Sequence, residues 1–538
     1  MTAGPPLRIV RAPRIVWAGV LAALVLAACA PGSGVSSGTA VPVQPDAPAP
    51  DVPSSTGDAP ADDNRPGPSP DGPGYDPGPI EWREYDDDLD TATVTVPVDY
   101  GNPTGPTIDL FVMRHRALDP DTRIGSLLVN PGGPGAPGSD LALYAPYQFD
   151  LPLLRRFDIV GWDPRGTGAS SPAIECIGDD DYDRMYAEVD STPDTPADHA
   201  LLVDVAQEFA TGCELGSAGI LEHVGTNNSA RDMDAIRQAL GEDTISYFGF
   251  SYGSELGATW VTLFPDTVRA AVLDGASDPD AEALEGSLQQ LEGFEQSVVR
   301  FLDACSRRNC AFAPDGDADA AYFELMESLD ANPVPSRPGR PDVNRDVATS
   351  AVIQAMYSDT YWPALEHSLA EAQGGDGSGL LQLYDEYYRR NPDGTYGNMF
   401  EAFQSISCAD VRERPTVAEV DREAALYEEV APHLVPPGSA GGYFCTFFPP
   451  AVDPRVDITG AGAGPVVVIG TTGDPATPFE STVAMADKLE DGRLISVDAN
   501  QHLGYGVNRC VVDAVNDYLI DLVAPAAPLE CGNGGLFG

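Results

Sequence analysis

The sequence contains few basic residues. Its 538 residues include 30 lysines and arginines but 83 aspartates and glutamates, which gives a formal net charge of −53 at pH 7. A phosphate backbone is bound through a basic surface, so this charge balance argues against nucleic acid as a partner. Apolar residues make up 43% of the chain, which predicts a globular protein with a large core rather than a disordered or multi-span membrane protein.

The sequence also lacks the spacing of a metal site. Its six histidines are scattered along the chain, and no two of its nine cysteines form a C-x-x-C pair. Closely spaced ligands of these kinds are typical of structural zinc sites. We therefore predict that the protein binds no metal and needs no cofactor.

One apolar run, near the amino terminus, has the features of a targeting segment. Three arginines precede residues 15–26, a run that is too short for a stable transmembrane helix but suits a signal peptide. It ends in Leu26-Ala27-Ala28-Cys29, which resembles a bacterial lipobox, so we predict a lipoprotein signal at residues 1–29 and a lipid on Cys29. The alternative is an ordinary secretory signal with an incidental cysteine.

The predicted location is the outer face of the cell membrane, with the exported protein held by its lipid and partly released. Residues 30–80 are rich in Pro, Gly, Ser, Ala and Asp and contain almost no large apolar side chain. Such a segment buries too little surface to offset its ordering entropy. We therefore expect a disordered tether, with membrane contact only through the lipid anchor.

Eight further cysteines follow the tether. An even number of cysteines in an exported chain predicts disulfides, although the sequence does not choose among the possible connectivities. We adopt nearest-neighbour pairing because it keeps every bridge local, and a zinc site is the competing interpretation. The predicted pairs are Cys176–Cys213, Cys305–Cys310, Cys408–Cys445 and Cys510–Cys531.

After the tether, short apolar runs alternate with helical patterns. Strand-like runs occupy residues 91–97, 108–114, 126–129, 157–160, 245–250 and 270–273. Between two of these runs, Thr226 begins a helix with apolar residues at three-to-four spacing, and Gly241 ends it. This alternation predicts an α/β fold with a doubly wound, mostly parallel sheet.

A G-x-S-x-G motif, Gly249-Phe250-Ser251-Tyr252-Gly253, lies where a predicted strand meets a predicted helix. Its glycines allow a sharp turn that exposes the Ser251 hydroxyl above the sheet, as in a nucleophile elbow. We interpret Ser251 as the nucleophile. The alternative is a tight turn with an inert serine.

A glycine-rich loop, Asn130-Pro131-Gly132-Gly133-Pro134-Gly135, follows the strand at residues 126–129. Backbone N–H groups of such a loop can approach a developing oxyanion closely. We predict that Gly133 and Tyr252 donate the two N–H groups of an oxyanion hole. The alternative is a flexible surface loop.

A general base and its carboxylate are expected near the carboxyl terminus. His502 follows a strand-like run at residues 494–497, and Asp474 follows another at residues 465–470. The order Ser251, Asp474, His502 is that of α/β-hydrolases. Taken singly, Asp474 has the alternative of a turn or cap residue, and His502 has that of a loop residue. We interpret residues 477–480 as a helix-capping box.

Five segments together carry a family resemblance: Asn130–Gly135, Gly161–Gly168 with the following Ser170-Ser171-Pro172, Gly249–Gly253, Ile406–Asp410 and Gly473–Pro478. They resemble the secreted tripeptidyl aminopeptidases, which are α/β-hydrolases related to the proline iminopeptidases. The resemblance extends from about Trp82 to Cys531. It implies a serine exopeptidase that removes short peptides, often tripeptides, from free amino termini, and hence peptide substrates. The alternatives are a carboxylesterase or lipase with the same triad and, in another class, a non-catalytic binding lipoprotein.

The long spacing between Ser251 and Asp474 predicts an inserted domain. Asp474 follows Ser251 by 223 positions, more than the intervening strand and helix need, and residues 284–302 carry an apolar stripe at three-to-four spacing. We predict a helical cap at residues 281–453, between core parts at 81–280 and 454–538, with residues 173–223 folded against it. The alternative interpretation of this apolar stripe is a helix face that packs on the core.

An aminopeptidase needs carboxylates for the substrate ammonium. We consider Glu255, one turn after the nucleophile, and Asp278, just past a strand end. For each, the alternative is a solvated or arginine-paired acid. We also expect Asp163 and Arg165 to pair with each other and brace the loops. The sequence does not indicate an oligomeric state.

Overall fold

The structure is a computed structural model that describes residues 75–217 and 219–533. The predicted signal, Cys29 and most of the predicted tether lie outside these residues. The end of that tether belongs to the fold, because the Tyr75 hydroxyl donates to the Thr95 carbonyl and the Ile80 N–H donates to the Ala239 carbonyl at 2.8 Å. The fold therefore includes residues at least as early as Tyr75, several positions before the boundary at Glu81 that the composition suggested.

Ten strands of the described chain form one sheet, in the order β1-β2-β3-β5-β4-β6-β7-β8-β9-β10. The pairs β1–β2, β2–β3 and β3–β5 are antiparallel. All the pairs from β5–β4 to β9–β10 are parallel. The predicted doubly wound, mostly parallel sheet is confirmed. The strands are β1 (Arg83–Asp86), β2 (Leu89–Pro97), β3 (Thr107–His115), β4 (Gly125–Asn130), β5 (Phe157–Trp162), β6 (Ile245–Phe250), β7 (Val268–Asp274), β8 (Val466–Thr471), β9 (Gly492–Val497) and β10 (Leu529–Cys531).

Burial explains why the strands were recognisable. Every residue of β4, β5, β6 and β8 is buried, as expected for parallel strands covered on both faces. The register pairs Asn130 with Gly249 and Gly249 with Leu273. The carboxyl ends of β4, β6 and β7 therefore meet at one edge, where ligands bind in open α/β sheets.

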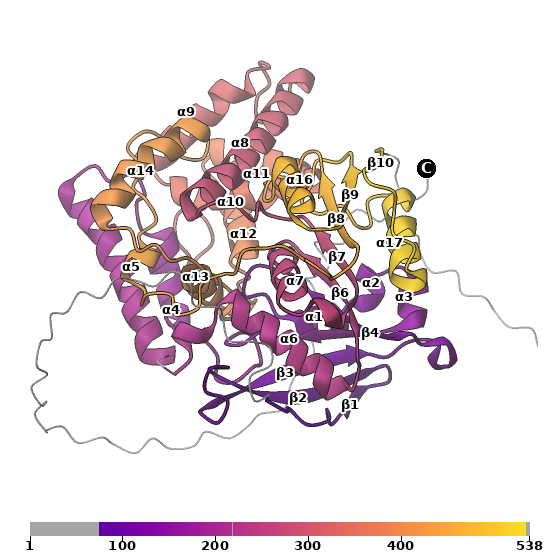
Figure 1. Cartoon of the computed structure of the whole chain (residues 1–538). Helices are drawn as coiled ribbons and strands as arrows, with labels where there is room; N and C mark the ends of the chain where they lie inside the picture. The colour runs from indigo at the N-terminus through magenta and orange to yellow at the C-terminus, as the bar shows by residue number, and fades with distance from the viewer. Residues whose placement is uncertain (1–74, 218, 534–538) are drawn as a thin grey trace, which may run out of the picture.

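Helices cover both faces of the sheet (Figure 1), each face with its own apolar cluster. One face packs against α6 (Thr226–Leu240), α7 (Tyr252–Leu263) and α16 (Phe479–Lys488). The other packs against α1 (Gly138–Leu143), α3 (Leu151–Arg156) and α17 (Arg509–Asp521), with α2 (Ala145–Gln148) between the first two. The core is thus a three-layer arrangement around the sheet.

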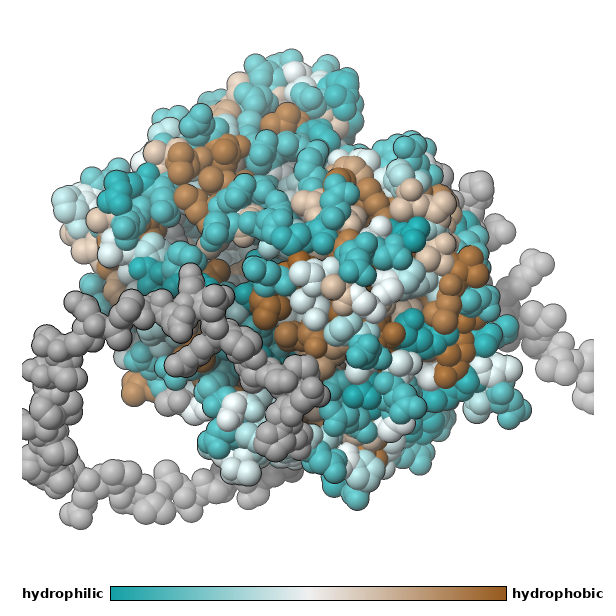
Figure 2. Space-filling view, in the orientation of Figure 1, coloured by the Kyte–Doolittle hydropathy of each residue, from teal (hydrophilic) through white to brown (hydrophobic). Residues whose placement is uncertain are grey.

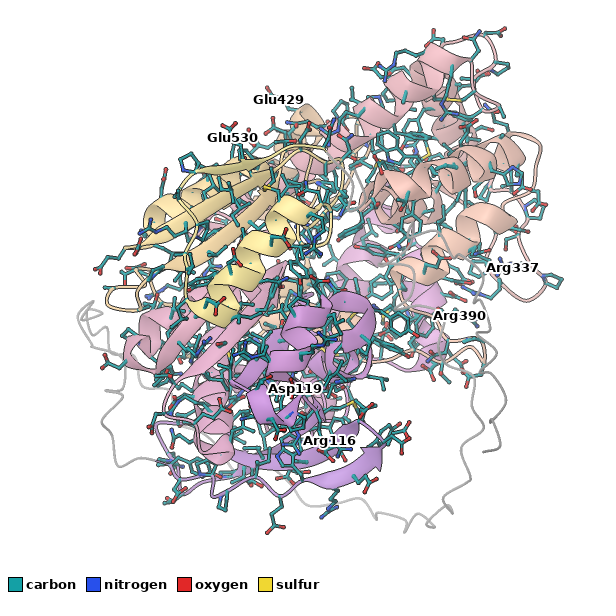
Figure 3. All side chains as sticks on the ribbon, turned by 90° about the vertical axis from the view of Figure 1, so that its right-hand side faces the viewer. Arg116, Asp119, Arg337, Arg390, Glu429 and Glu530 are labelled. Atoms are coloured by element: carbon teal, nitrogen blue, oxygen red, sulfur yellow. A yellow bond between two sulfur atoms is a disulfide. The ribbon has the colours of Figure 1, made fainter. Side chains whose placement is uncertain are left out.

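A second group of helices forms a lobe beside the sheet (Figure 1), and we refer to it as the cap. Most of it falls within residues 281–453 and buries a separate apolar cluster. In Figure 3, Arg337 and Arg390 mark the cap, and Arg116 and Asp119 lie on the core. The cap helices are α8 (Ala283–Arg308), α9 (Ala318–Ala331), α10 (Arg345–Met356), α11 (Trp362–Gln373), α12 (Ser378–Tyr387), α13 (Met399–Asp410), α14 (Val417–Val430) and α15 (Phe444–Phe447).

The segment between β5 and α6 joins this cap. It contains α4 (Asp179–Tyr182) and α5 (Pro196–Ser217). Phe209 of α5 packs in one apolar cluster with Cys408 and Phe448 from the carboxyl-terminal part of the cap. Two insertions that are distant in sequence therefore share one core.

The eight cysteines of the described chain form four disulfides. The pairs are Cys176–Cys213, Cys305–Cys310, Cys408–Cys445 and Cys510–Cys531, the nearest-neighbour set that we adopted. No helix among the described residues combines the length and apolar character needed to cross a membrane. Figure 2 shows a largely hydrophilic face on which apolar residues occur in scattered patches.

Candidate active site

The turn between β6 and α7 holds Ser251 in a strained conformation. Its φ is 56° and its ψ is −127°, a region that non-glycine residues rarely occupy and that is common at functional sites. The flanking glycines are required by space, because a Cβ on Gly249 would lie 2.1 Å from the Gly253 carbonyl oxygen, and one on Gly253 would lie 2.7 Å from that of Asn130. The motif therefore forms a nucleophile elbow, as predicted from its sequence.

Asp474 and His502 form a buried hydrogen-bonded pair. The His502 Nδ1 lies 2.8 and 2.9 Å from the two carboxylate oxygens of Asp474, and both residues are 4% exposed. Asp474 also accepts the N–H groups of Ala476 and Thr477 at 2.9 Å. A carboxylate on Nδ1 fixes the proton there and leaves Nε2 as the acceptor. Nε2 is buried and has no hydrogen-bond partner among the residues that the structure describes.

The segment Asp274–Gly275 lies next to both the nucleophile and the histidine. The Ser251 N–H donates to the Asp274 carbonyl oxygen at 2.8 Å. The next residue, Gly275, has a φ of +71°, and a Cβ placed on it would lie 3.0 Å from His502 Cε1. On the other side, the ring of Tyr357 packs edge-on against the imidazole at 5.7 Å, and its carbonyl accepts the His502 N–H at 2.8 Å.

This contact yields a prediction for Gly275→Ala. The new methyl group meets the imidazole and also needs a left-handed backbone, so His502 has to shift. A displacement on the order of 1 Å at a reacting group costs roughly 100-fold in rate, and we expect kcat to fall by about that factor with little change in KM. Gly241→Ala is the matched control, because Gly241 also has a positive φ but its Cβ would meet nothing within 4 Å. Equal losses of activity in the two variants would contradict the explanation.

The glycine-rich loop lies directly against the elbow. A Cβ on Gly132 would lie 2.9 Å from Ser251 Cβ, and the φ values of Gly132 and Gly133 are +96° and +106°. The Gly132 N–H is already used, because it donates to the Asn130 side chain at 2.9 Å. Tyr252 is the first residue of α7, so its N–H has no partner within the helix. Gly133 and Tyr252 both line the cavity that Ser251 faces, as an oxyanion hole requires.

Comparison with known proteins agrees with this geometry. Residues 125–508 match the family model of the alpha/beta hydrolase fold. The chain belongs to the alpha/beta hydrolase family. The predicted resemblance is confirmed as well, since the hydrolase is 30% identical over 473 residues to the tripeptidyl aminopeptidase of Streptomyces coelicolor, with 84% of this chain and 86% of that protein covered.

Two relatives from Mycobacterium tuberculosis are more similar. The hydrolase is 37% identical over 459 residues to the serine protease Hip1, with 81% of this chain and 86% of that protein covered. It is 39% identical over 455 residues to carboxylesterase B, with coverages of 82% and 86%. The family match and these relatives identify the protein as a serine hydrolase.

The cavity at Ser251 has a volume of about 450 Å³ and an acidic lining. It lies between the core and the cap, because α7 and the loops after β7 and β8 form one wall, and α8 and α13 form another. Its charged lining residues are four acids and one arginine: Glu255, Asp278, Glu282, Asp410 and Arg455. A cavity with this excess of carboxyls favours a cationic ligand group.

The two acids that we considered for the substrate ammonium both line this cavity, with different partners. Glu255 forms an ion pair with Arg455 at 2.5 Å and accepts a hydrogen bond from the Ser277 hydroxyl at 3.1 Å. It is the arginine-paired acid of the alternative interpretation. Asp278 accepts one from the Gln289 amide at 3.2 Å and is half-buried.

Asp410 was missed as a candidate for the ammonium site. Its carboxylate accepts the N–H and the hydroxyl of Thr226 at 2.6 and 2.5 Å. Burial, helped by the nearby charge of Glu255, raises its pKa to about 7, and the charge of Arg455 opposes that rise. The Ile406–Asp410 segment was one of the five family segments, but nothing in its sequence indicated that it folds against Ser251.

Two further expectations were wrong. Arg165 does not pair with Asp163 but lies fully buried against Asp232 at 2.6 Å, whereas Asp163 accepts the N–H groups of Ser139 and Ala169 at 3.1 and 2.8 Å. Asp232 is on α6, and its approach to the Arg165 loop depends on long-range packing.

Residues 477–480 do not form a capping box, because α16 begins at Phe479 after Pro478 and has no side-chain cap. The Thr477 hydroxyl instead lies 3.4 Å from His502 Nδ1. Among the described residues, no group of acids, cysteines and histidines has the arrangement of a metal site.

Proposed function

We propose that the protein is a serine exopeptidase that releases short peptides, most often tripeptides, from free amino termini through an acyl-enzyme. The observation that carries this proposal is the acidic cavity beside Ser251. Its four carboxyls face a single guanidinium, an excess that a substrate ammonium would neutralise. Peptidase names among the relatives, the serine protease Hip1 and the tripeptidyl aminopeptidase, support the same reaction.

In the proposed mechanism, the Ser251 hydroxyl attacks the scissile carbonyl and passes its proton to Nε2 of His502. Asp474 holds Nδ1 and stabilises the imidazolium, while the N–H groups of Gly133 and Tyr252 bind the oxyanion. His502 then gives the proton to the leaving amine, which departs and leaves an ester on Ser251. A water molecule, deprotonated by His502, hydrolyses that ester and releases the short peptide.

The cavity volume supports a limit on substrate length. Sites for small ligands occupy roughly 300–1,000 Å³, and three extended residues span about 10 Å. The observed 450 Å³ therefore suits the end of a peptide rather than a long stretch of chain. We assign the amino-terminal ammonium to the carboxyls of Asp410, Asp278 and Glu255, among which Glu255 already has a cation.

We also propose that the enzyme works outside the cytoplasm, held by a lipid on Cys29. Four disulfides support an oxidising compartment. The amino-terminal sequence, with its apolar run and Leu26-Ala27-Ala28-Cys29, supports lipidation.

The alternative is a carboxylesterase, which the relative named carboxylesterase B favours. A panel of fluorogenic aminoacyl, dipeptidyl and tripeptidyl amides, together with a p-nitrophenyl ester, separates the two. We expect the tripeptidyl amide to be cleaved at the highest kcat/KM, with the intact tripeptide detected by mass spectrometry, and Ser251→Ala to cleave none of the substrates. Hydrolysis of the ester without cleavage of any amide would favour the carboxylesterase.

A further inference from the structure

Asp274 contacts both loops that carry the reacting groups. It is the last residue of β7 and is fully buried. Its two carboxylate oxygens each accept a backbone N–H at 2.8 Å, from Gly504 and from Tyr505. Its own carbonyl oxygen accepts the Ser251 N–H at 2.8 Å. One residue thus joins the nucleophile elbow to the loop that follows His502.

Both of these loops contain a strained residue next to the chemistry. Leu503, directly after His502, has a φ of 76°, and Ser251 has a φ of 56°. Non-glycine residues persist in this region only where the surrounding contacts hold them. Asp274 supplies such contacts on both sides, through its carboxylate at residues 504–505 and through its backbone at Ser251.

The charge of Asp274 also faces the site. The ionisable groups around it are His502, from the loop after β9, and Asp474, from the loop after β8. Burial raises its pKa to about 7, while the two N–H donors and the charge on His502 act in the opposite direction. No arginine or lysine of the described chain forms an ion pair with it, so the carboxylate depends on the two amides. Keeping a buried carboxyl ionised without a cation partner costs free energy, and the two amide hydrogen bonds offset part of that cost.

We propose that Asp274 is a positioning residue, whose carboxylate fixes the His502 loop against the Ser251 elbow and adds a second negative charge toward the imidazolium that forms during acyl transfer. This role rests on the proposed triad but not on the nature of the acyl group. It is separate from that of Asp474, which bonds Nδ1 directly.

The proposal has a signature in the pH profile. The most active form has a neutral His502 and an ionised Asp274. Protonation of Asp274, whose pKa burial raises to about 7, should therefore lower activity on the acid side in addition to the loss that follows protonation of the general base. With a neutral ester as substrate, log kcat/KM should fall with a slope above one over about one to two pH units, the range that a 10- to 100-fold effect spans, and should return to a slope of one at lower pH. A structural role for Asp274 would leave the slope at one.

The test compares Asp274→Asn with the wild type on p-nitrophenyl acetate and a fluorophosphonate. Asparagine has the same shape but presents an NH2 group to one of the two amides, and it carries no charge. Losing a hydrogen bond to a charged group corresponds to roughly a 10- to 100-fold effect, so we expect kcat and the labelling rate to fall by that factor. KM should change by no more than about twofold, and the segment of the acid profile with a slope above one should be absent.

Asp346→Asn is the matched control. Asp346 is on α10 in the cap, accepts the Ser191 N–H at 3.1 Å, and has a pKa that burial raises. It contacts neither Ser251 nor His502, so its variant should keep the wild-type kcat and the steeper segment of the acid profile.

Wild-type kcat and slope in Asp274→Asn would overturn the proposal. So would a wild-type acid profile with a slope of one throughout, a measurement that remains decisive if the variant fails to fold. These outcomes differ from failure of the proposed function, in which Ser251→Ala would retain activity, or would still react with the fluorophosphonate.

Discussion

Replacing Ser251 by alanine is expected to lower kcat by at least about four orders of magnitude. The variant keeps the cavity and the predicted oxyanion donors, so substrate binding should change little. It loses the atom that forms the acyl-enzyme, and only binding and electrostatic stabilisation remain. The measurement is kcat on a p-nitrophenyl ester and on a tripeptidyl amide, with the melting temperature as a check on folding.

The other two members of the triad should behave as parts of the same unit. His502→Ala and Asp474→Ala should each reduce kcat by several orders of magnitude, and a double variant should be little worse than the worst single one. A fluorophosphonate should label Ser251 in the wild type and fail to label Ser251→Ala. Additive losses across the three positions, or labelling of another serine, would mean that the reacting groups have been assigned incorrectly.

Acetylating the amino terminus of a good tripeptide substrate is expected to lower kcat/KM about 100-fold or more. The cavity offers four carboxyls and one arginine, and that arginine is already paired with Glu255 at 2.5 Å. Without the ammonium, Asp410 and the half-buried Asp278 lose the cation that offsets their charges, which is costly in a partly desolvated site. The measurement is kcat/KM on matched free and acetylated tripeptidyl amides.

Asp410→Asn provides the control for this effect. The asparagine side chain keeps the shape that contacts Thr226 but has no charge. The ratio of kcat/KM for the free peptide to that for the acetylated peptide should therefore fall by tenfold or more, which corresponds to about 1.4 kcal/mol or more. Activity on a neutral ester should be retained, because the variant leaves Ser251, Asp474 and His502 unchanged. Equal rates on free and acetylated peptides in the wild type would rule out an amine anchor in this cavity.

The sequence was most informative where structure is local. The strand at residues 245–250 was predicted with its observed bounds, and α6 begins at Thr226 and ends before Gly241 as expected. Buried parallel strands are continuous apolar runs, and helix ends depend on nearby residues, so both can be read from a short window. The elbow was recognisable because its pattern spans only five residues, although Gly253 is also required by its approach to the distant Asn130.

Contacts between distant segments could not be read in this way. Arg165 was expected to pair with its neighbour Asp163 but pairs with Asp232, which is 67 residues away. Asp410 and Asp274 have ordinary surroundings in the sequence, and their burial depends on how the cap and the His502 loop pack against the core. The Asp474–His502 pair was an exception, because the order of the proposed triad along the chain, with each member after a strand, is itself a pattern.

The apolar cluster that α5 shares with the carboxyl-terminal part of the cap has a consequence for cooperativity. Because Phe209 packs with Phe448 and Cys408, residues 173–223 and 281–453 cannot open independently without exposing the same apolar surface to water. The free energy of opening is then common to both, and segments that join the core at different strands behave as one foldon. Amide protons in the two insertions should exchange together, at a rate distinct from that of the sheet.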